Sequence, residues 1–312
     1  MQSEDIVLKC AVAIRNGRTE KIEVDLQALF PDDMETGTYL REQKLLLSAV
    51  VRKNETALAR HVLDKHGERL YAALRESEQE ALSFEFLQMM IFAVCDRRLS
   101  ELREEVGKMV TVFTGTLDEK RSIYFWSEWT GLLARMLRRG WKGESTWLFR
   151  ILLRELLNSC GNKRRSLLLN LQQHFCLYCC WDGSDKALTA YEHLFAFYML
   201  LIGRAAEERR SVAERKEDLQ TAVRALRDLV TSASRMQMSD ELEVFTRWHE
   251  LLLARAGSER KQRRVKKLFQ MTILYWQNTM PKSSRKQMQF LRGLTEPDVL
   301  TASDKTLLRD IS

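Results

Sequence analysis

Hydrophobic and polar positions follow one period near the N-terminus and a different period along the rest of the chain. Apolar side chains first fall on alternate positions, at Ile6, Leu8, Cys10, Val12 and Ile14 and again at Ile22, Val24 and Leu26. A period of two is typical of β-strands, and Asn16-Gly17 between the two stretches is a strong hairpin signal. The pattern therefore predicts an N-terminal β-hairpin within residues 1–35 that packs one face on the rest of the protein.

The register of this hairpin follows from which side chains share a face. A two-residue turn at Asn16-Gly17 splits the apolar set between the two faces. A three-residue loop that ends at Gly17, with Gly17 in the left-handed conformation, instead pairs residues 6 with 26, 8 with 24 and 10 with 22. This second register places every apolar member on one face, and it is the register that we predict.

From about Tyr39 onwards the spacing is helical. Apolar residues recur three and four positions apart, for example at Leu45, Leu46, Ala49, Val50, Leu58 and Val62. Three Ser/Thr-x-x-Glu sequences, beginning at Ser77, Thr116 and Ser211, fit the capping box of a helix N-terminus. The chain has only 3 prolines, and none lies between Pro31 and Pro281. We therefore predict an all-α domain over residues 36–292, followed by a capping segment or tail over residues 293–312.

Glycines suggest how these helices repeat. Gly115, Gly140, Gly161, Gly183 and Gly203 fall at positions where helices would end, and alternate ones are 42 to 46 residues apart. Two helices in such an interval match the unit of about 40–47 residues in HEAT- and armadillo-type repeats. The similarity is one of spacing only, and an irregular bundle of long helical hairpins would give the same spacing. The predicted fold is thus an α-solenoid or an irregular helical bundle.

Composition limits the compartment and the class of protein. Hydrophobic residues make up 45% of the chain and charged residues 30%, which is enough apolar material for a folded core. The acidic start does not resemble a signal peptide, and the longest apolar run is too short to span a bilayer. The 6 cysteines lie mostly in apolar runs, as expected of reduced core residues. We expect a cytoplasmic protein without a membrane partner.

Motifs for catalysis and cofactor binding do not occur. The chain contains no GxGxxG, GxxxxGK[ST] or GxSxG sequence, and its 5 histidines are scattered. We therefore predict a non-enzymatic protein with no cofactor and no small-molecule substrate. A weaker alternative is a metal site formed by His174, Cys176, Cys179 and His193, because Cys-x-x-Cys has the spacing of zinc ligands. The favoured interpretation is that Cys176, Cys179 and Cys180 lie buried on a helix without a metal.

Charge gives the strongest positive indication of function. Between Arg255 and Arg292 there are eleven basic residues and one acidic residue, although the whole chain carries a net charge of only +7. A second basic segment, residues 135–165, has nine basic and two acidic residues. Such clusters are typical of polyanion-binding surfaces, although a solvated helix face gives the same pattern. The candidate contact residues are Lys163, Arg164, Arg165, Arg260, Arg263, Arg264 and Lys267.

The two groups of candidate contact residues, 163–165 and 260–267, are expected to lie at the same edge of the molecule. Helix ends near residues 115, 161, 206 and 258 share one edge if successive helices are antiparallel, and this edge carries both segments. We predict that their basic residues are exposed there.

Aromatic residues and architecture complete the functional prediction. Phe125 and Trp129 are spaced as core residues of one helix face, whereas Trp141 lies beside Arg138, Arg139 and Lys142 and is the aromatic most expected to be exposed. Stacked helices form long binding surfaces, so the leading hypothesis is a scaffold or adaptor that binds another protein. The alternative is a protein that binds RNA or DNA through its basic C-terminal helices.

Overall fold

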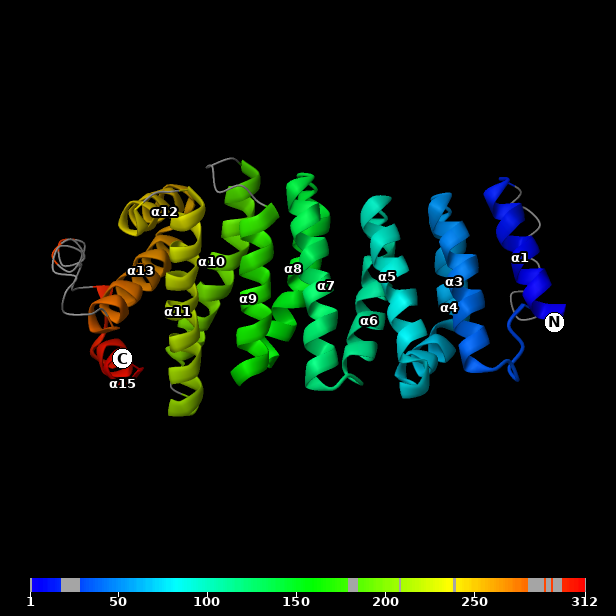
Figure 1. The fold of residues 1–312 in the computed structure, drawn as a ribbon, viewed down its shortest axis with the longest axis horizontal. Helices are drawn as coiled ribbons and strands as arrows, with labels where there is room; N and C mark the ends of the chain where they lie inside the picture. Colours follow the sequence, from blue (N-terminus) through cyan, green and yellow to red (C-terminus); the bar gives the residue numbers. More distant parts are fainter. Residues whose placement is uncertain are drawn as a thin grey trace. The chain divides into compact units, whose positions relative to one another are not determined.

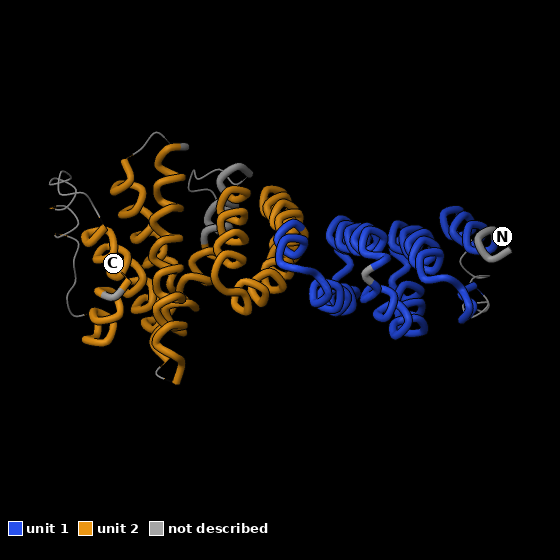
Figure 2. The backbone as a smooth tube through the Cα atoms, turned by 60° about the horizontal axis from the view of Figure 1, so that its bottom comes forward, with its two compact units in different colours: residues 1–124 blue, residues 125–312 orange. Residues whose placement is uncertain are grey.

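The computed structural model describes residues 2–17, 29–178, 185–207, 209–237, 240–279 and 299–311, together with the single positions 289 and 293. Within these ranges the regular elements are thirteen α-helices and two short 3-10 helices, with no strand (Figure 1). The prediction of an all-α fold is confirmed. The chain divides into two compact units, residues 1–124 and 125–312 (Figure 2). This division falls inside the predicted helical domain 36–292, whose outer boundaries stay predictions.

The first unit is built from helices that pack on their neighbours in sequence. They are α1 (Gln2–Arg15), α3 (Thr36–Arg52), α4 (Thr56–Arg75), α5 (Glu80–Asp96) and α6 (Arg103–Thr114), with 3-10 turns at Ser77–Gln79 and Ser100–Leu102. Helix α3 contacts α1, α4 and α5, while α4 also contacts α6. Helices α3 and α4 therefore each touch both the next helix and the one after it.

The predicted hairpin is wrong, because residues 2–15 form helix α1. Val7, Ala11 and Ile14 are four and three positions apart, so they form one stripe on a helix, and all three are buried at 0–1% exposure. This stripe packs against α3, whereas Ile6, Leu8 and Val12 of the expected strand face stay exposed. Gly17 does have a positive φ of 76°, but it follows a helix. The second predicted strand lies mostly in residues 18–28, outside the described residues.

Helix α7 (Glu119–Arg138) spans the boundary between the units, and the second unit continues with six further α-helices and α15. These are α8 (Lys142–Asn158), α9 (Gly161–Tyr178), α10 (Asp185–Ala205), α11 (Val212–Gln237), α12 (Glu241–Arg255), α13 (Glu259–Thr279) and α15 (Ala302–Ile311). Leu307 and Leu308 of α15 are buried, and this helix packs on α11 and α13. The described end of the predicted C-terminal segment is thus a docked helix.

Local sequence explains several of these helix boundaries. The predicted capping box at Ser211 is formed, since Glu214 N donates to Ser211 Oγ and Ser211 N donates to Glu214 Oε2. At α7 the prediction is wrong, because Asp118 rather than Thr116 accepts the hydrogen bond of the first turn, from Arg121 N. Ser77 begins a 3-10 turn and its side chain lies outside the described atoms. Gly140 ends α7 with a φ of 72°, as expected of a left-handed C-terminal residue.

Helices α9 and α11 run in the same direction, and α13 contacts both α11 and α15. The amide of Gly161 at the start of α9 donates to Glu217 near the start of α11, and Gln172 further along α9 donates to the carbonyl of Ala225. Arg224 of α11 likewise donates to Tyr275 of α13. Two adjacent residues at the start of α15, Ser303 and Asp304, contact Arg215 of α11 and Lys267 of α13 respectively. The N-terminal ends of α9 and α11 therefore lie at the same end of the second unit.

The core between α10, α12 and α13 is aromatic. Phe269 of α13 lies 4.7 Å from Phe245 and 6.0 Å from Phe195, measured between ring centroids. Trp248 and Trp276 pack beside these rings and are 5% and 2% exposed. This cluster fixes α13 against the rest of the second unit. Within the described ranges, none of the helices combines the length and the apolar character needed to cross a bilayer.

Candidate functional site

The basic residues near the start of α13 surround a hollow of about 630 Å³. Its lining is formed by Glu259, Arg260, Arg263, Arg264, Lys266, Lys267 and Val299. Val265, Leu268, Phe269 and Thr272 of the same helix are buried, so the helical period turns the intervening cations outward. We call Arg260, Arg263, Arg264, Lys266 and Lys267 the α13 basic surface.

These cations differ in whether the protein already neutralises them. Arg263 pairs with Glu259 at 2.5 Å, but both side chains are 77% exposed, so the pair contributes little stability. Arg260 and Arg264 are exposed and have no hydrogen bond or ion pair with any described residue. Two guanidinium groups one helical turn apart are thus available to an external anion.

Lys267 has a structural role. Its ammonium lies 2.9 Å from the Asp304 carboxylate, which is only 5% exposed. The other Asp304 oxygen accepts from Thr301 N, which caps the start of α15. The interpretation of Lys267 as an exposed contact residue therefore needs correction, because it is 21% exposed and holds α15 in place.

We expect Lys267→Glu to destabilise the second unit by about 2 kcal/mol, less than for a fully buried pair because Lys267 keeps some solvent contact. The change would place a second carboxylate beside Asp304 and weaken the docking of α15. Urea unfolding measures the loss, and hydrogen exchange of α15 amides locates it. Lys305→Glu is the matched control, since Lys305 is exposed on α15. Equal stability of the two variants would contradict the role of Lys267.

The other predicted contact residues, Lys163, Arg164 and Arg165, have three different environments. Lys163 pairs with Glu155 at 2.5 Å and is 26% exposed. Arg164 is 4% exposed, which contradicts the prediction that it faces solvent. Arg165 is exposed, with no hydrogen bond or ion pair to a described residue. Of this segment only Arg165 is available to a partner. That the 163–165 and 260–267 residues share one edge stays a prediction.

Arg164 is buried because it belongs to a charge network that joins three helices. Its Nη1 lies 2.6 Å from Asp218 Oδ1, and its Nε donates to the carbonyls of Leu156 and Ser159. Arg204 and Arg210 contact the other Asp218 oxygen at 3.2 Å and 2.7 Å. The buried carboxylate of Asp218 on α11 thus pairs with three guanidinium groups, which come from α9, α10 and the segment before α11. Sequence reasoning missed this network because its members are far apart in the chain.

The weak metal alternative receives no support from the described residues. No group of three or more His, Cys, Asp or Glu side chains comes together in the described part of the chain. His193 stacks on Phe149 with ring centroids 4.6 Å apart, and burial lowers its pKa to about 4. His174 lies against Gly131 of α7, and burial lowers its pKa too. The side chains of Cys176, Cys179 and Cys180 lie outside the described residues, so the prediction for them stays open.

The aromatic residues near α7 and α8 mostly form core. Phe125, Trp126 and Trp129 are buried, and Trp129 Nε1 donates to the carbonyl of Leu148 at 3.0 Å. Trp141 is half-buried at the N-terminus of α8, with the Arg139 guanidinium 4.9 Å from its ring centroid. Tyr124 is more exposed, at 61%. The predicted exposed aromatic is therefore covered in part by a cation–π contact.

Comparison with known proteins finds no matching protein-family model, no matching curated protein and no matching solved structure. The candidate surfaces are accordingly assigned from their side-chain geometry. Among the predicted contact residues, Arg165, Arg260 and Arg264 combine exposure with guanidinium groups that make no hydrogen bond or ion pair with a described residue.

Proposed function

We propose that this chain is a non-enzymatic helical-repeat protein that binds an acidic segment of another protein through the α13 basic surface. The observation that carries the proposal is the pair of unneutralised guanidinium groups, Arg260 and Arg264, beside a hollow of about 630 Å³. A planar guanidinium donates two parallel hydrogen bonds to a carboxylate, so an acidic side chain is a suitable ligand for each.

The contacts between helices support a repeat architecture. In the first unit α3 contacts α5 and α4 contacts α6, and in the second unit α9 contacts α11, which contacts α13. Contacts between every second helix are expected when helical pairs stack in one direction, and stacked pairs present extended binding surfaces. A scaffold or adaptor is the function class that this arrangement favours.

An acidic protein segment is favoured over nucleic acid by the lining of the hollow. The described lining has five cations, one carboxylate and one valine, but no aromatic side chain on which a base could stack. Binding to RNA or DNA there would rest on phosphate contacts alone. Nucleic acid is therefore the alternative that the experiment must separate.

We expect the triple variant R260E/R263E/R264E to bind fluorescein-labelled poly-L-glutamate about 10-fold or more weakly than the parent, because three charge-assisted contacts become repulsive. The substitutions fall near the start of α13, where acidic side chains are favoured by the helix dipole, so the fold should persist. Lys267 is left unchanged because it holds α15 in place. Fluorescence anisotropy across a salt series measures the affinity, and circular dichroism checks the fold.

The matched control is R150E/R154E/R247E, which changes the net charge by the same amount on α8 and α12. These three arginines are exposed and have no described ion pair. Poly-uridine is titrated in parallel. An equal loss of affinity for poly-L-glutamate in both triple variants would overturn the proposal. So would a parent protein that binds poly-uridine tightly and does not bind poly-L-glutamate.

A further inference from the structure

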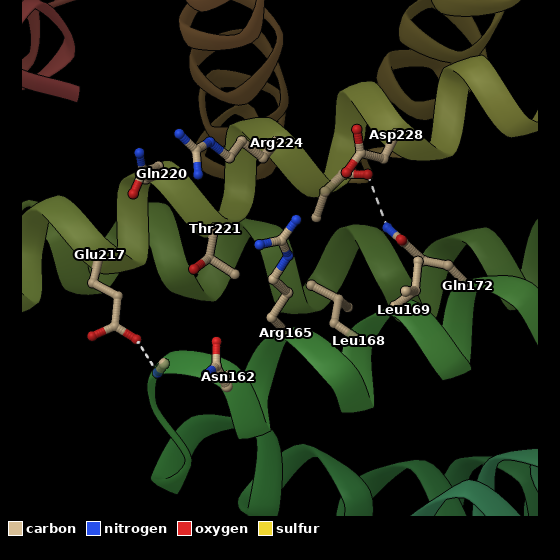
Figure 3. Close-up of a pocket in the computed structure, with 12 residues that line it drawn as sticks. Asn162, Arg165, Leu168, Leu169, Gln172, Glu217, Gln220, Thr221, Arg224 and Asp228 are labelled. Carbon is tan, nitrogen blue, oxygen red and sulfur yellow. Dashed lines mark hydrogen bonds between the residues drawn. The ribbon is translucent and has the colours of Figure 1, made fainter. Parts of the chain in front are cut away.

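Helices α9 and α11 enclose a groove of about 250 Å³ in the second unit, shown in Figure 3. Its residues on α9 are Gly161, Asn162, Arg165, Leu168, Leu169 and Gln172, and those on α11 are Glu217, Gln220, Thr221, Arg224, Ala225 and Asp228. Within each set, neighbouring members are mostly three or four positions apart, so each helix presents one continuous stripe. Because the two helices are parallel, both stripes run along the groove in the same N-to-C direction.

The floor of this groove is apolar and its walls are polar. Leu168 and Ala225 are buried at 4% and 5% exposure, whereas Leu169 at the rim is 48% exposed. Two of the polar side chains are already used within the protein. Glu217 accepts from Gly161 N, and Gln172 donates to the carbonyl of Ala225 at 2.8 Å. These contacts hold the two helices at a fixed separation.

The remaining polar side chains are available to a ligand. Arg165, Asn162, Gln220 and Thr221 have no side-chain hydrogen bond or ion pair with a described residue. Arg224 donates from Nε to Tyr275 Oη at 2.7 Å, which fixes its side chain while leaving both Nη groups for other acceptors. Figure 3 shows Arg165 reaching from α9 toward α11, where Thr221 and Arg224 lie.

The two groove carboxylates do not neutralise these arginines by direct contact. Glu217 interacts with the N-terminus of α9 and with Arg164, at 3.7 Å. Asp228 lies at the far end of the groove and has no ion pair with a described residue. Burial raises the pKa of Asp228, while Arg227, Arg165 and Arg224 oppose that shift. The middle of the groove is therefore the part that attracts an anion.

The spacing of the stripes matches an extended peptide. Gln220, Arg224 and Asp228 lie four positions apart, which places successive side chains about 6 Å apart along the helix axis. Side chains on one face of an extended strand are spaced by about 6.6–6.8 Å. An extended segment can therefore place alternate side chains against successive groove residues, while the amides of Asn162 and Gln220 bond to its main chain.

We infer that the groove between α9 and α11 binds an extended segment of a partner protein and holds an acidic side chain of that segment between Arg165 and Arg224. This inference rests on the proposed function in taking the partner to be an acidic protein segment. It adds a second site for acidic protein segments, in a groove separate from the α13 basic surface. Leu169 would contact an apolar side chain next to the acidic one.

The test is a selection of random twelve-residue peptides displayed on phage against the full-length protein. We expect the selected peptides to share an acidic residue at one position, with an apolar residue close to it. The best peptide should bind R165A/R224A about 10-fold or more weakly than the parent, because two charge-assisted contacts are lost. R165K should give an intermediate affinity, since lysine keeps the charge without the planar fork.

R150A/R154A is the matched control and should bind the selected peptide as the parent does, since these exposed arginines lie on α8. Peptides without a shared acidic residue would overturn the inference, and so would unchanged binding by R165A/R224A. Binding of poly-uridine that is lost only in R165A/R224A would overturn it in favour of nucleic acid. If R165A/R224A still binds the selected peptide but R260E/R263E/R264E no longer binds poly-L-glutamate, the groove inference fails while the proposed function stands.

Discussion

Replacing Asp218 with alanine is expected to destabilise the second unit by about 3–5 kcal/mol, the cost of removing one partner from a buried ion pair. Asp218 is 1% exposed and is the shared acceptor of Arg164, Arg204 and Arg210. Without it, the 4% exposed Arg164 guanidinium keeps its backbone acceptors but loses its buried counter-ion, and its remaining carboxylate partner is then Glu217 at 3.7 Å. Urea unfolding of the full chain measures the effect, with hydrogen exchange of α9 and α11 amides to locate it.

Two further variants make this prediction specific. Glu243→Ala removes a carboxylate from an exposed position of α12 and should change the stability by less than about 0.5 kcal/mol. The double variant R164M/D218L replaces the buried ion pair with apolar side chains and should recover part of the loss, because the uncompensated charge is gone. A cost below about 1 kcal/mol for Asp218→Ala would contradict the role of the network.

Replacing Phe269 with alanine is expected to destabilise the second unit by about 3–5 kcal/mol, as for other buried phenylalanines. The ring is 1% exposed and lies 4.7 Å from the rings of both Phe245 and His249. Its removal leaves a cavity between α10, α12 and α13, so α13 should exchange its amide hydrogens faster. Because α13 carries the basic surface, poly-L-glutamate binding should weaken at temperatures where this helix opens.

The control for the cavity is Leu200→Ala, which shortens a side chain that is 39% exposed on α10. Its cost should stay below about 1 kcal/mol, since the leucine is only partly removed from water. Calorimetry and hydrogen exchange measure both variants. Faster exchange confined to the first unit in Phe269→Ala would contradict the assignment of this ring to the core that holds α13.

The candidate binding residues were predictable in part. The run of cations after Gly257 is visible in the sequence, and the buried stripe of α13 already places Arg260 and Arg264 on the solvent side. Arg164 has the same chemistry as Arg165, one position further on, yet the first is buried and the second exposed. A change of one position turns a helical side chain by about 100° around the helix axis. The sequence does not show that Asp218 lies on the buried side, where it pairs with Arg164.

The groove between α9 and α11 illustrates the same limit. Its two stripes are separated by a whole helix, and their residues are polar enough to look like ordinary solvated faces. Only the parallel packing of α9 on α11 brings Arg165 close to Thr221 and Arg224. The signal in the sequence is that both stripes share the three-and-four spacing of a packed helix face although they carry hydrogen-bonding side chains.

The helical class of this protein was determined by sequence alone, because proline is scarce and the apolar residues recur at the helical period over most of the chain. The N-terminus shows where that reasoning stops. The apolar positions of residues 6–14 fit both a strand period and a helix period. The segment forms a helix because this places Val7, Ala11 and Ile14 on one buried stripe against α3. Burial and ion pairing depend on which distant segments meet, so only the tertiary structure decided that Arg164 and Lys267 support the fold while Arg165, next to Arg164, faces the solvent.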